Sequence, residues 1–354
     1  MPDYRVLVSL AVGFKRIRRQ KLGWIESMNI DFHCHFYPEE YLKKLEASKG
    51  DVRIEKNEKG EKIILSMGAK AGPVTEDFFD IEVRLDKIKR NRIDMQILTT
   101  PHPGIDRFSP DESAEMARII NDGLSQVVKK YPKSFHALAM LPLIDTKRAL
   151  KELDRAIFDL GLKGLCMLTN VAGQTSDSDF LLPIYERAQE LGVPIFIHPT
   201  TPVGAQVMRE WRLAIILGFE FDIMLSATRL AYSGILERFP ELSFVIAHLG
   251  AGLPFVAGRI DRGYYDPMCG VKTKRPTSEY LKELHTDTVC FYQPTLKFAY
   301  EFFGAERMVM GSDFPLPIGD LEAAVPSIEE MDISKDEKDK ILGKNVQRLL
   351  KLNA

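Results

Sequence analysis

Two histidines stand one residue apart at the end of an apolar run, in the stretch "NIDFHCHFYPEEY". Because successive side chains of a β-strand point to opposite faces, we expect His33 and His35 to share one face and Cys34 to lie on the other. Two neighbouring imidazoles at a strand end are suited to bind a divalent metal ion. The same spacing also fits a surface strand with two polar residues on its wet face. The metal site is therefore a hypothesis that needs further ligands.

Three other polar residues end short apolar runs in the same way. They are His198 in "PIFIHP", His248 in "FVIAHLG" and Asp313 in "MVMGSDFP". A carboxylate among apolar neighbours needs a partner, because burying a lone charge is costly. With the first histidine pair, His198 and Asp313 would give three imidazoles and one carboxylate, which suits Zn²⁺ or a similar ion with a position left for water or substrate. The alternative is that His198 and Asp313 only cap strands through hydrogen bonds.

The elements that must position these residues alternate between short β-type runs and amphipathic helical runs. Several strands are apolar on both faces, as in buried parallel sheets. The pattern predicts a (β/α)₈ TIM barrel. A doubly wound sheet is the alternative, but the place of its Gly-rich loop holds "HCHFYPEE". The expected strands are 28–34, 94–100, 135–142, 163–169, 194–200, 243–249, 286–291 and 307–312, and the expected helices lie near 80–92, 111–131, 145–160, 178–191, 206–218, 221–239, 277–284 and 294–303.

The barrel sorts the histidines into two groups. Catalytic groups of TIM barrels lie at the carboxyl ends of the strands, and residues at the amino ends serve stability. The candidate ligands and His248 all end strands, whereas His136 and His285 precede or begin strands and should lie at the opposite end. His102, in "TTPHPG" after the second strand, either lines the pocket or belongs to a plain turn.

Two segments interrupt the alternation, and one precedes it. Residues 51–67 read as a small β-hairpin inserted after the first strand, on the face where such barrels carry their sites. The tail from 320 onward predicts C-terminal helices packed outside the barrel. Residues 1–27 carry a charge of +4, which leaves −6 for residues 28–354. We interpret 1–27 as an appendage that precedes a natural start at Met28, or else as a basic helix that contacts a membrane or partner, and 28–354 as a single barrel domain.

Bulk composition excludes several classes of function. The chain has 354 residues, of which 45% are hydrophobic and 28% charged, and a net charge of −2. This is the composition of a soluble globular protein, and it gives no sign of a nucleic-acid or membrane partner. The four cysteines fit no CxxC pattern. They are interpreted as reduced thiols of a cytoplasmic protein.

The segments "DFHCHFYP", "IFIHP", "VIAHLGAGLPFVAGRID" and "RMVMGSDFPLP" together resemble the amidohydrolase superfamily. The resemblance is to the branch typified by aminocarboxymuconate-semialdehyde decarboxylase, which also contains resorcylate-type decarboxylases and some hydratases and hydrolases. It covers residues 28 to about 350. It implies one divalent metal ion per chain, zinc or alternatively manganese, because Lys163 lies at the wrong end of its strand to bridge two ions. The implied metal ligands are His33, His35, His198 and Asp313.

The resemblance also implies roles for two further residues. His248 matches a histidine beside the metal that serves as acid or base, and Asp313 would share that work. Arg259, in "AGRID", matches an arginine that reaches the neighbouring subunit's site and holds a substrate carboxylate, which implies a homodimer. The alternative for Arg259 is a helix ion pair with Asp261 or Asp266.

The chain also departs from the patterns of both subgroups. The stretch "GAKAGPVTEDF" has no arginine where the aminocarboxymuconate enzymes have one, and Lys70 is the nearest cation. His33 and Ala251 stand where several resorcylate-type enzymes have glutamates. We therefore predict a metal-dependent decarboxylase of a carboxylated aromatic or muconate-semialdehyde-like small molecule. The alternatives are a metal-dependent hydrolase of a lactone, ester or amide, a hydratase, or a non-catalytic barrel with a structural metal.

Overall fold

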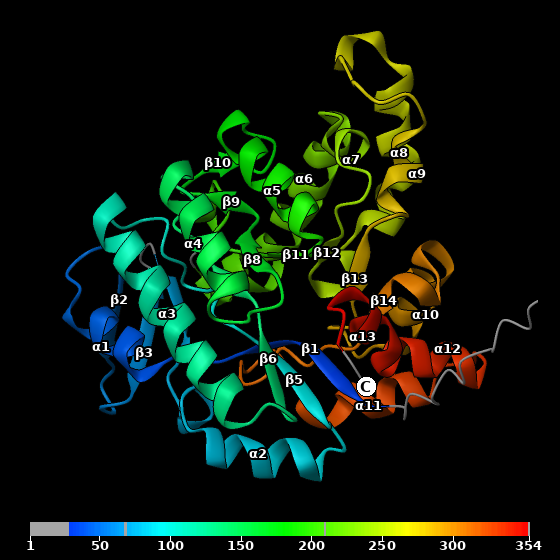
Figure 1. Ribbon diagram of the computed structural model, residues 1–354. Coiled ribbons are helices and arrows are strands. Elements are labelled where there is room, and N and C mark those ends of the chain that lie inside the picture. Colours follow the sequence, from blue (N-terminus) through cyan, green and yellow to red (C-terminus); the bar gives the residue numbers. More distant parts are fainter. Residues whose placement is uncertain (1–27, 67–68, 209, 353–354) are drawn as a thin grey trace, which may run out of the picture.

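A computed structural model describes residues 28–66, 69–208 and 210–352. Within these residues, eight short parallel strands follow one another around a central axis (Figure 1). Each prediction of a strand is confirmed, with ends shifted by a few residues. The strands are β1 (Ile30–His35), β5 (Met95–Thr99), β6 (Phe135–Ala137) continued by β7 (Ala139–Met140), β8 (Leu165–Leu168), β11 (Ile195–His198), β12 (Phe244–Ile246), β13 (His285–Asp287) and β14 (Met308–Val309).

Backbone hydrogen bonds close these strands into a barrel. One sheet has the order β1-β5-β6, and a second has the order β14-β13-β12-β11-β8-β7. Leu138 separates β6 from β7, and its N–H donates to Leu98, so the two sheets are continuous there. On the other side, the N–H of Phe32 donates to Met310 (2.8 Å) and that of His35 to Phe314 (2.7 Å). The predicted TIM barrel is thus confirmed.

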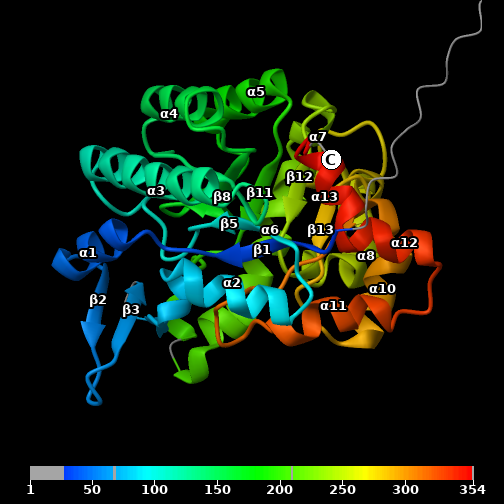
Figure 2. The ribbon, with the colours of Figure 1, turned by 60° about the horizontal axis from the view of Figure 1, so that its bottom comes forward.

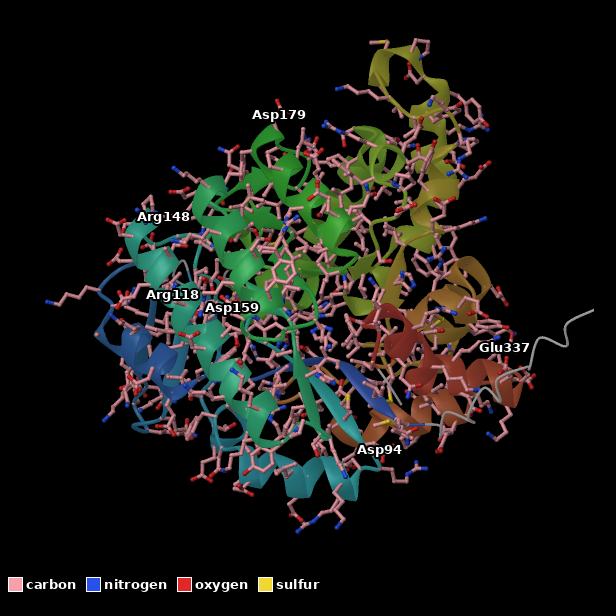
Figure 3. The ribbon with its side chains drawn as sticks, in the orientation of Figure 1. Asp94, Arg118, Arg148, Asp159, Asp179 and Glu337 are labelled. Atoms are coloured by element: carbon pink, nitrogen blue, oxygen red, sulfur yellow. The ribbon has the colours of Figure 1, made fainter. Side chains whose placement is uncertain are left out.

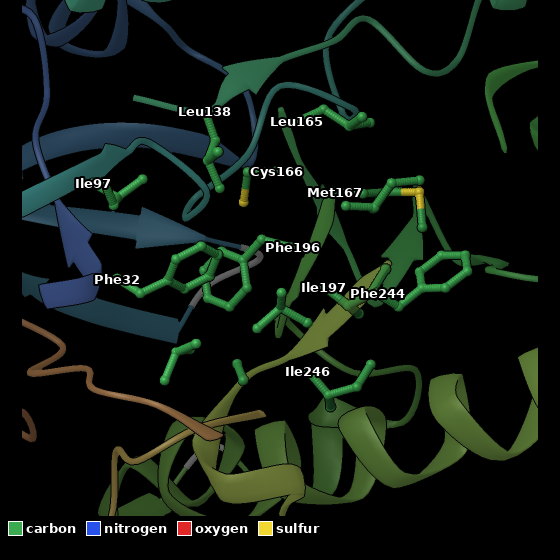
Figure 4. Packing of buried hydrophobic residues seen from close by; sticks show 14 of the residues in the cluster. Phe32, Ile97, Leu138, Leu165, Cys166, Met167, Phe196, Ile197, Phe244 and Ile246 are labelled. Carbon is green, nitrogen blue, oxygen red and sulfur yellow. The ribbon is translucent and has the colours of Figure 1, made fainter. Parts of the chain in front are cut away.

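Large apolar side chains fill the barrel interior. Phe32 of β1 and Phe196 of β11 meet edge to face, with ring centroids 5.3 Å apart, and neither is exposed. Ile97 and Leu138 close the space beside them (Figure 4). Full burial of such a side chain stabilises a fold by about 1.5–3 kcal/mol relative to exposure. This packing fixes the strands whose carboxyl ends carry the candidate site.

Helices cover the outside of the strands, and Figure 2 shows α3, α4 and α5 lying outside β8 and β11. Of the charged residues labelled in Figure 3, Arg118 of α3, Arg148 of α4 and Asp159 at the end of α4 are exposed. Helix α3 begins at a capping box formed by Ser109 and Glu112. The described residues form no helix long and apolar enough to span a membrane. The main helices of this layer are α2 (Ile81–Arg90), α3 (Pro110–Lys130), α4 (Thr146–Phe158), α5 (Leu182–Leu191), α6 (Phe219–Tyr232) and α10 (Gln293–Phe303).

Three segments differ from the predicted helices. Helices α1 (Glu39–Ala47) and α8 (Leu253–Tyr265) were not expected, and α8 with α9 (Thr277–Leu281) projects from the body (Figure 1). The single helix expected over 206–218 is wrong, since the chain there forms short 3₁₀ turns at Ala205–Val207 and Glu210–Arg212 and a π-helical turn at Ala214–Gly218. Trp211 and Arg212 have φ of 52° and 59°, and this left-handed backbone ends any helix.

The predicted hairpin is present and has a third strand. Strands β2 (Val52–Lys56), β3 (Lys62–Ser66) and β4 (Ala69–Pro73) form an antiparallel sheet. The hydroxyls of Ser66 and Thr201 lie 3.2 Å apart, which places this sheet at the face where the strands end. The C-terminal helices α11 (Leu321–Glu329), α12 (Lys335–Asp339) and α13 (Asn345–Leu349) pack outside the barrel. Residues 1–27 lie outside the described residues.

Candidate active site

The four predicted metal ligands meet at the carboxyl ends of the strands. His33 and His35 come from β1, His198 ends β11, and Asp313 follows β14. One ligand atom from each lies within 4.8 Å of all the others, and every one of these residues is buried. Asp313 Oδ1 lies 2.7 Å from His35 Nε2 and 3.3 Å from His33 Nε2. The strand-period argument therefore placed the first histidine pair on one face correctly.

Each of the three imidazoles is held by an oxygen at its Nδ1 atom. His33 Nδ1 lies 2.6 Å from Asp287 Oδ2, and His198 Nδ1 lies 2.7 Å from the carbonyl of Pro199. His35 Nδ1 lies 3.2 Å from the hydroxyl of Thr99, which donates its own proton to the Cys34 carbonyl and so accepts from the ring. With an ion bound, these contacts would hold the ring proton on Nδ1 and leave the Nε2 lone pairs for the ion.

The donor set fits a metal ion. His33 Nε2, His198 Nε2 and Asp313 Oδ2 are buried without a hydrogen-bond partner among the described residues. Buried polar atoms of this kind are costly unless something satisfies them. Imidazole nitrogen and carboxylate oxygen are donors that zinc takes, so the chemistry of this set suits such an ion. Asp313 has φ of 57°, an uncommon backbone conformation of the kind found at functional sites.

The electrostatics of the cluster favour a cation. Burial opposes a charge on His33, but Asp287 and Asp313 outweigh it and raise the pKa of His33 to about 10. Burial also opposes a charge on Asp313, yet the neighbouring imidazoles of His33 and His35 hold the pKa of that carboxyl well below its usual range. Burial lowers the pKa of His35 to about 4. Ionised carboxylate in this dry site attracts positive charge, which a divalent ion supplies.

His248 stands beside the cluster as predicted, and a residue that the sequence did not reveal holds it. Its ring is parallel to that of His33, with centroids 5.4 Å apart. Its Nδ1 lies 2.8 Å from Glu220 Oε1, and its Nε2 is buried without a partner among the described residues. Glu220 lies in the first turn of α6, where its only sequence signal is an acid within the apolar run "ILGFEFDIM".

A cavity of about 380 Å³ opens onto this group. His248, Asp313 and Glu220 line its polar side, while apolar residues such as Ile215 and Phe291 form the rest of the wall. An apolar cavity with a few convergent polar groups is the usual form of a small-molecule site. Trp211 is 80% exposed and does not line the cavity.

Arg259 lies away from the cavity of its own chain. It is exposed on α8 and forms no ion pair with any residue that the structure describes. Asp261 instead binds Ser278, and Asp266 accepts from the N–H of Met268. The alternative of a helix ion pair is therefore not formed, and the guanidinium is left facing outward.

The fold and the site define a TIM barrel with a metal-type cluster at the carboxyl ends of its strands. Residues 30–352 match the model of the amidohydrolase family, so the chain belongs to that family, as the sequence predicted. It is 30% identical to 2-amino-3-carboxymuconate-6-semialdehyde decarboxylase of Dictyostelium discoideum over 334 residues, 92% of each chain.

Solved structures agree with this assignment. The fold matches 5-carboxyvanillate decarboxylase from Sphingomonas paucimobilis with a TM-score of 0.82 and 23% identity, over 93% of this chain and 100% of that one. It also matches a dihydroxybenzoic acid decarboxylase from Polaromonas sp. JS666, solved with manganese and the inhibitor 2-nitroresorcinol, with a TM-score of 0.76 and 26% identity, over 92% and 98% of the chains. The decarboxylase activity predicted from the sequence is that of these relatives.

Proposed function

We propose that the protein is a metal-dependent decarboxylase of a small carboxylated aromatic compound. The observation that carries the proposal is the pairing of a buried three-histidine, one-aspartate cluster with His248, whose Nε2 is free to act in the adjoining cavity. The apolar walls suit a ring, and the relatives named above remove CO₂ from carboxylated substrates. His33, His35, His198 and Asp313 would hold the ion.

A bound divalent ion supplies Lewis acidity, which polarises a substrate oxygen and draws electron density away from the reacting bond. Residues of the chain itself then transfer the proton. His248 or Asp313 delivers a proton to the carbon that bears the carboxylate, and as the bond to that carboxylate breaks its electron pair returns to the carbon and CO₂ leaves. Glu220 keeps the Nδ1 proton of His248 in place, so Nε2 is the atom that exchanges protons with the substrate.

The identity of the metal ion, the cellular compartment and an alternative activity form part of the same proposal. Zinc is the ion we propose, with manganese as the alternative, since the ligand set suits both. Buried Cys34 and Cys166 are free thiols, which supports a reducing compartment and hence the cytoplasm. The alternative activity is hydrolysis of a lactone, ester or amide, or hydration of a double bond, since the same acid–base groups can serve those reactions.

A homodimer is proposed from the surface around the cavity mouth. Helix α6 lies beside the start of α8, since a Cβ on Gly252 would lie 2.8 Å from the sulfur of Met224. Large exposed apolar side chains on monomers mark interaction surfaces when they gather on adjacent elements. Arg259 lies one turn beyond Phe255, where a second chain could bring it to the partner's cavity. The exposed apolar residues of these elements and the preceding loop are Val203, Val207, Trp211, Ile216, Leu217, Phe221, Leu225 and Phe255.

Elemental analysis together with a CO₂-release screen tests the activity. We expect about one metal ion per chain, and CO₂ from at least one dihydroxybenzoate or other carboxylated phenol, lost on chelation and restored by the ion. A metal-loaded protein that releases no CO₂ but hydrolyses esters or lactones would contradict the decarboxylase. Muconate semialdehydes belong in the screen because they represent the other predicted substrate class.

Mixed dimers test the role of Arg259. Arg259→Ala and His198→Ala should each inactivate the homodimer. A refolded equal mixture should regain about one quarter of the wild-type activity, because a mixed dimer then has one site with both groups intact. No recovery in a mixture that sediments as dimers would contradict a contribution of Arg259 across the interface.

A further inference from the structure

His102 is a buried histidine that the mechanism above does not use. It follows β5 at the carboxyl end of the barrel and is 5% exposed. Its carbonyl accepts a hydrogen bond of 2.5 Å from Tyr37, two residues beyond His35. Its ring lies 5.5 Å from that of Phe219, which immediately precedes the cavity residue Glu220. These contacts fix the ring between β1 and the start of α6, on the same side as the metal-type cluster.

Both ring nitrogens of His102 are buried without a hydrogen-bond partner among the described residues. Each of the other histidines has no more than one buried ring nitrogen without a partner, and those outside the cluster, His136 and His285, lie at the opposite end of the barrel. A buried polar group left unpaired costs about 1–3 kcal/mol. A bound molecule that presents a hydrogen-bonding atom would remove this cost.

The hydrogen-bonding chemistry of the His102 imidazole limits which chemical groups a bound molecule can place beside it. Burial is the largest cause that lowers the pKa of His102, to about 4, so the imidazole is neutral near pH 7. A neutral imidazole has one N–H donor and one acceptor. A carboxylate can only accept, whereas a hydroxyl both donates and accepts and so can pair with either nitrogen. A ring hydroxyl also suits the apolar contact with Phe219.

We propose that His102 binds a phenolic hydroxyl of the substrate, so that this site selects hydroxybenzoate-type carboxylates over muconate semialdehydes. The inference rests on the proposed function, because it takes the metal-type cluster as the place of the carboxylate. It gives the loop after β5 a role in specificity and leaves the proton-transfer groups unchanged.

Binding of unreactive probes tests this role without relying on turnover. The metal-loaded protein is titrated by calorimetry with 2-nitroresorcinol, which carries ring hydroxyls, and with benzoate, which has a carboxylate but none. His102→Phe removes both nitrogens and keeps an aromatic ring beside Phe219. We expect it to weaken 2-nitroresorcinol about tenfold and benzoate less than twofold. His102→Gln, whose amide can donate and accept, should recover part of the loss.

His285→Phe is the matched control, because His285 is equally buried, at 5% exposed, but begins β13 at the other end of the barrel. It should leave both affinities unchanged. Equal weakening of the two probes by His102→Phe, or none, would overturn the role of His102 while leaving the proposed function in place. A metal-loaded wild type that binds neither probe and releases no CO₂ would overturn both. If His102→Phe does not fold, His102→Leu, which also removes both ring nitrogens, replaces it with the same expected ratio of the two affinities.

Discussion

Buried histidines at the two ends of the barrel have opposite surroundings. At the carboxyl ends of the strands, His33, His35 and His198 converge with their Nε2 atoms directed at one another and their Nδ1 atoms held by oxygens. At the amino ends, His136 and His285 stand apart, and nearby cations act on each ring. The residue type is the same, but only the first group forms a site.

The difference teaches that neighbouring groups decide what a buried imidazole does. Carboxylates and carbonyls behind the first group orient the rings and favour a cation in their centre. Burial, and after it the positive charge of Lys163 beside His136 and of Arg307 beside His285, keeps those rings neutral, and the same charges repel a cation. The predictions below test this contrast, beginning with the largest effect.

His198→Ala should abolish metal binding. It removes one of four ligands and leaves the others around an incomplete sphere, so we expect metal content to fall at least tenfold and CO₂ release at least a hundredfold. Elemental analysis after dialysis and a CO₂ assay measure the two effects. His136→Ala, at the other end, should keep a full metal content. Retention of the ion by His198→Ala would mean that the cluster is not the metal site.

Glu220→Ala should lower kcat about tenfold or more without changing metal content. The variant frees the Nδ1 proton of His248, so the ring can turn or exchange tautomers, and general acid–base catalysis is worth about 10²–10⁴ in rate. Glu220→Gln should retain most of the activity, because its amide oxygen can still accept from Nδ1. Steady-state kinetics on metal-loaded proteins separate kcat from KM. If both variants lose the metal, the role of Glu220 is to stabilise the metal-type cluster, and the proposed role of orienting His248 is contradicted.

His285→Phe should change only how stability depends on pH. Burial, together with Arg307 and Arg348, lowers the pKa of His285 to about 3. Below the unfolded value of about 6.5 the unfolded chain takes up a proton that the folded chain does not, so stability is lost as pH falls. Because of this histidine, the free energy of unfolding of the wild type should fall by about 2 kcal/mol between pH 7.5 and pH 5.0.

Urea unfolding at those two pH values measures the effect. The loss between pH 7.5 and 5.0 should be smaller in His285→Phe by that amount, while kcat and metal content stay at wild-type values. An unchanged pH dependence would show that His285 takes up its proton equally in both states.

Much of the fold and the ligand set could be predicted because period-two strands and their ends are local in sequence. His33 and His35 shared a face as expected, and the barrel rule brought His198 and Asp313 to the same end. Glu220 could not be predicted, because it lies in the first turn of α6 and not at the end of a strand, so its contact with His248 depends on how that helix starts. Helix α8 was missed because "HLGAGLP" reads as a loop, although Pro254 in its first turn is compatible with a helix.

The bond between the first and last strands has a consequence for the order of events in synthesis. His35 and Asp313 are 278 residues apart, and backbone bonds from β1 to the segment after β14 hold them together. A chain still being made has the histidine pair long before it has the aspartate. The ion can therefore be bound by its full ligand set only after the last strand is in place, and its binding then stabilises the closed ring over any form with the last strand detached.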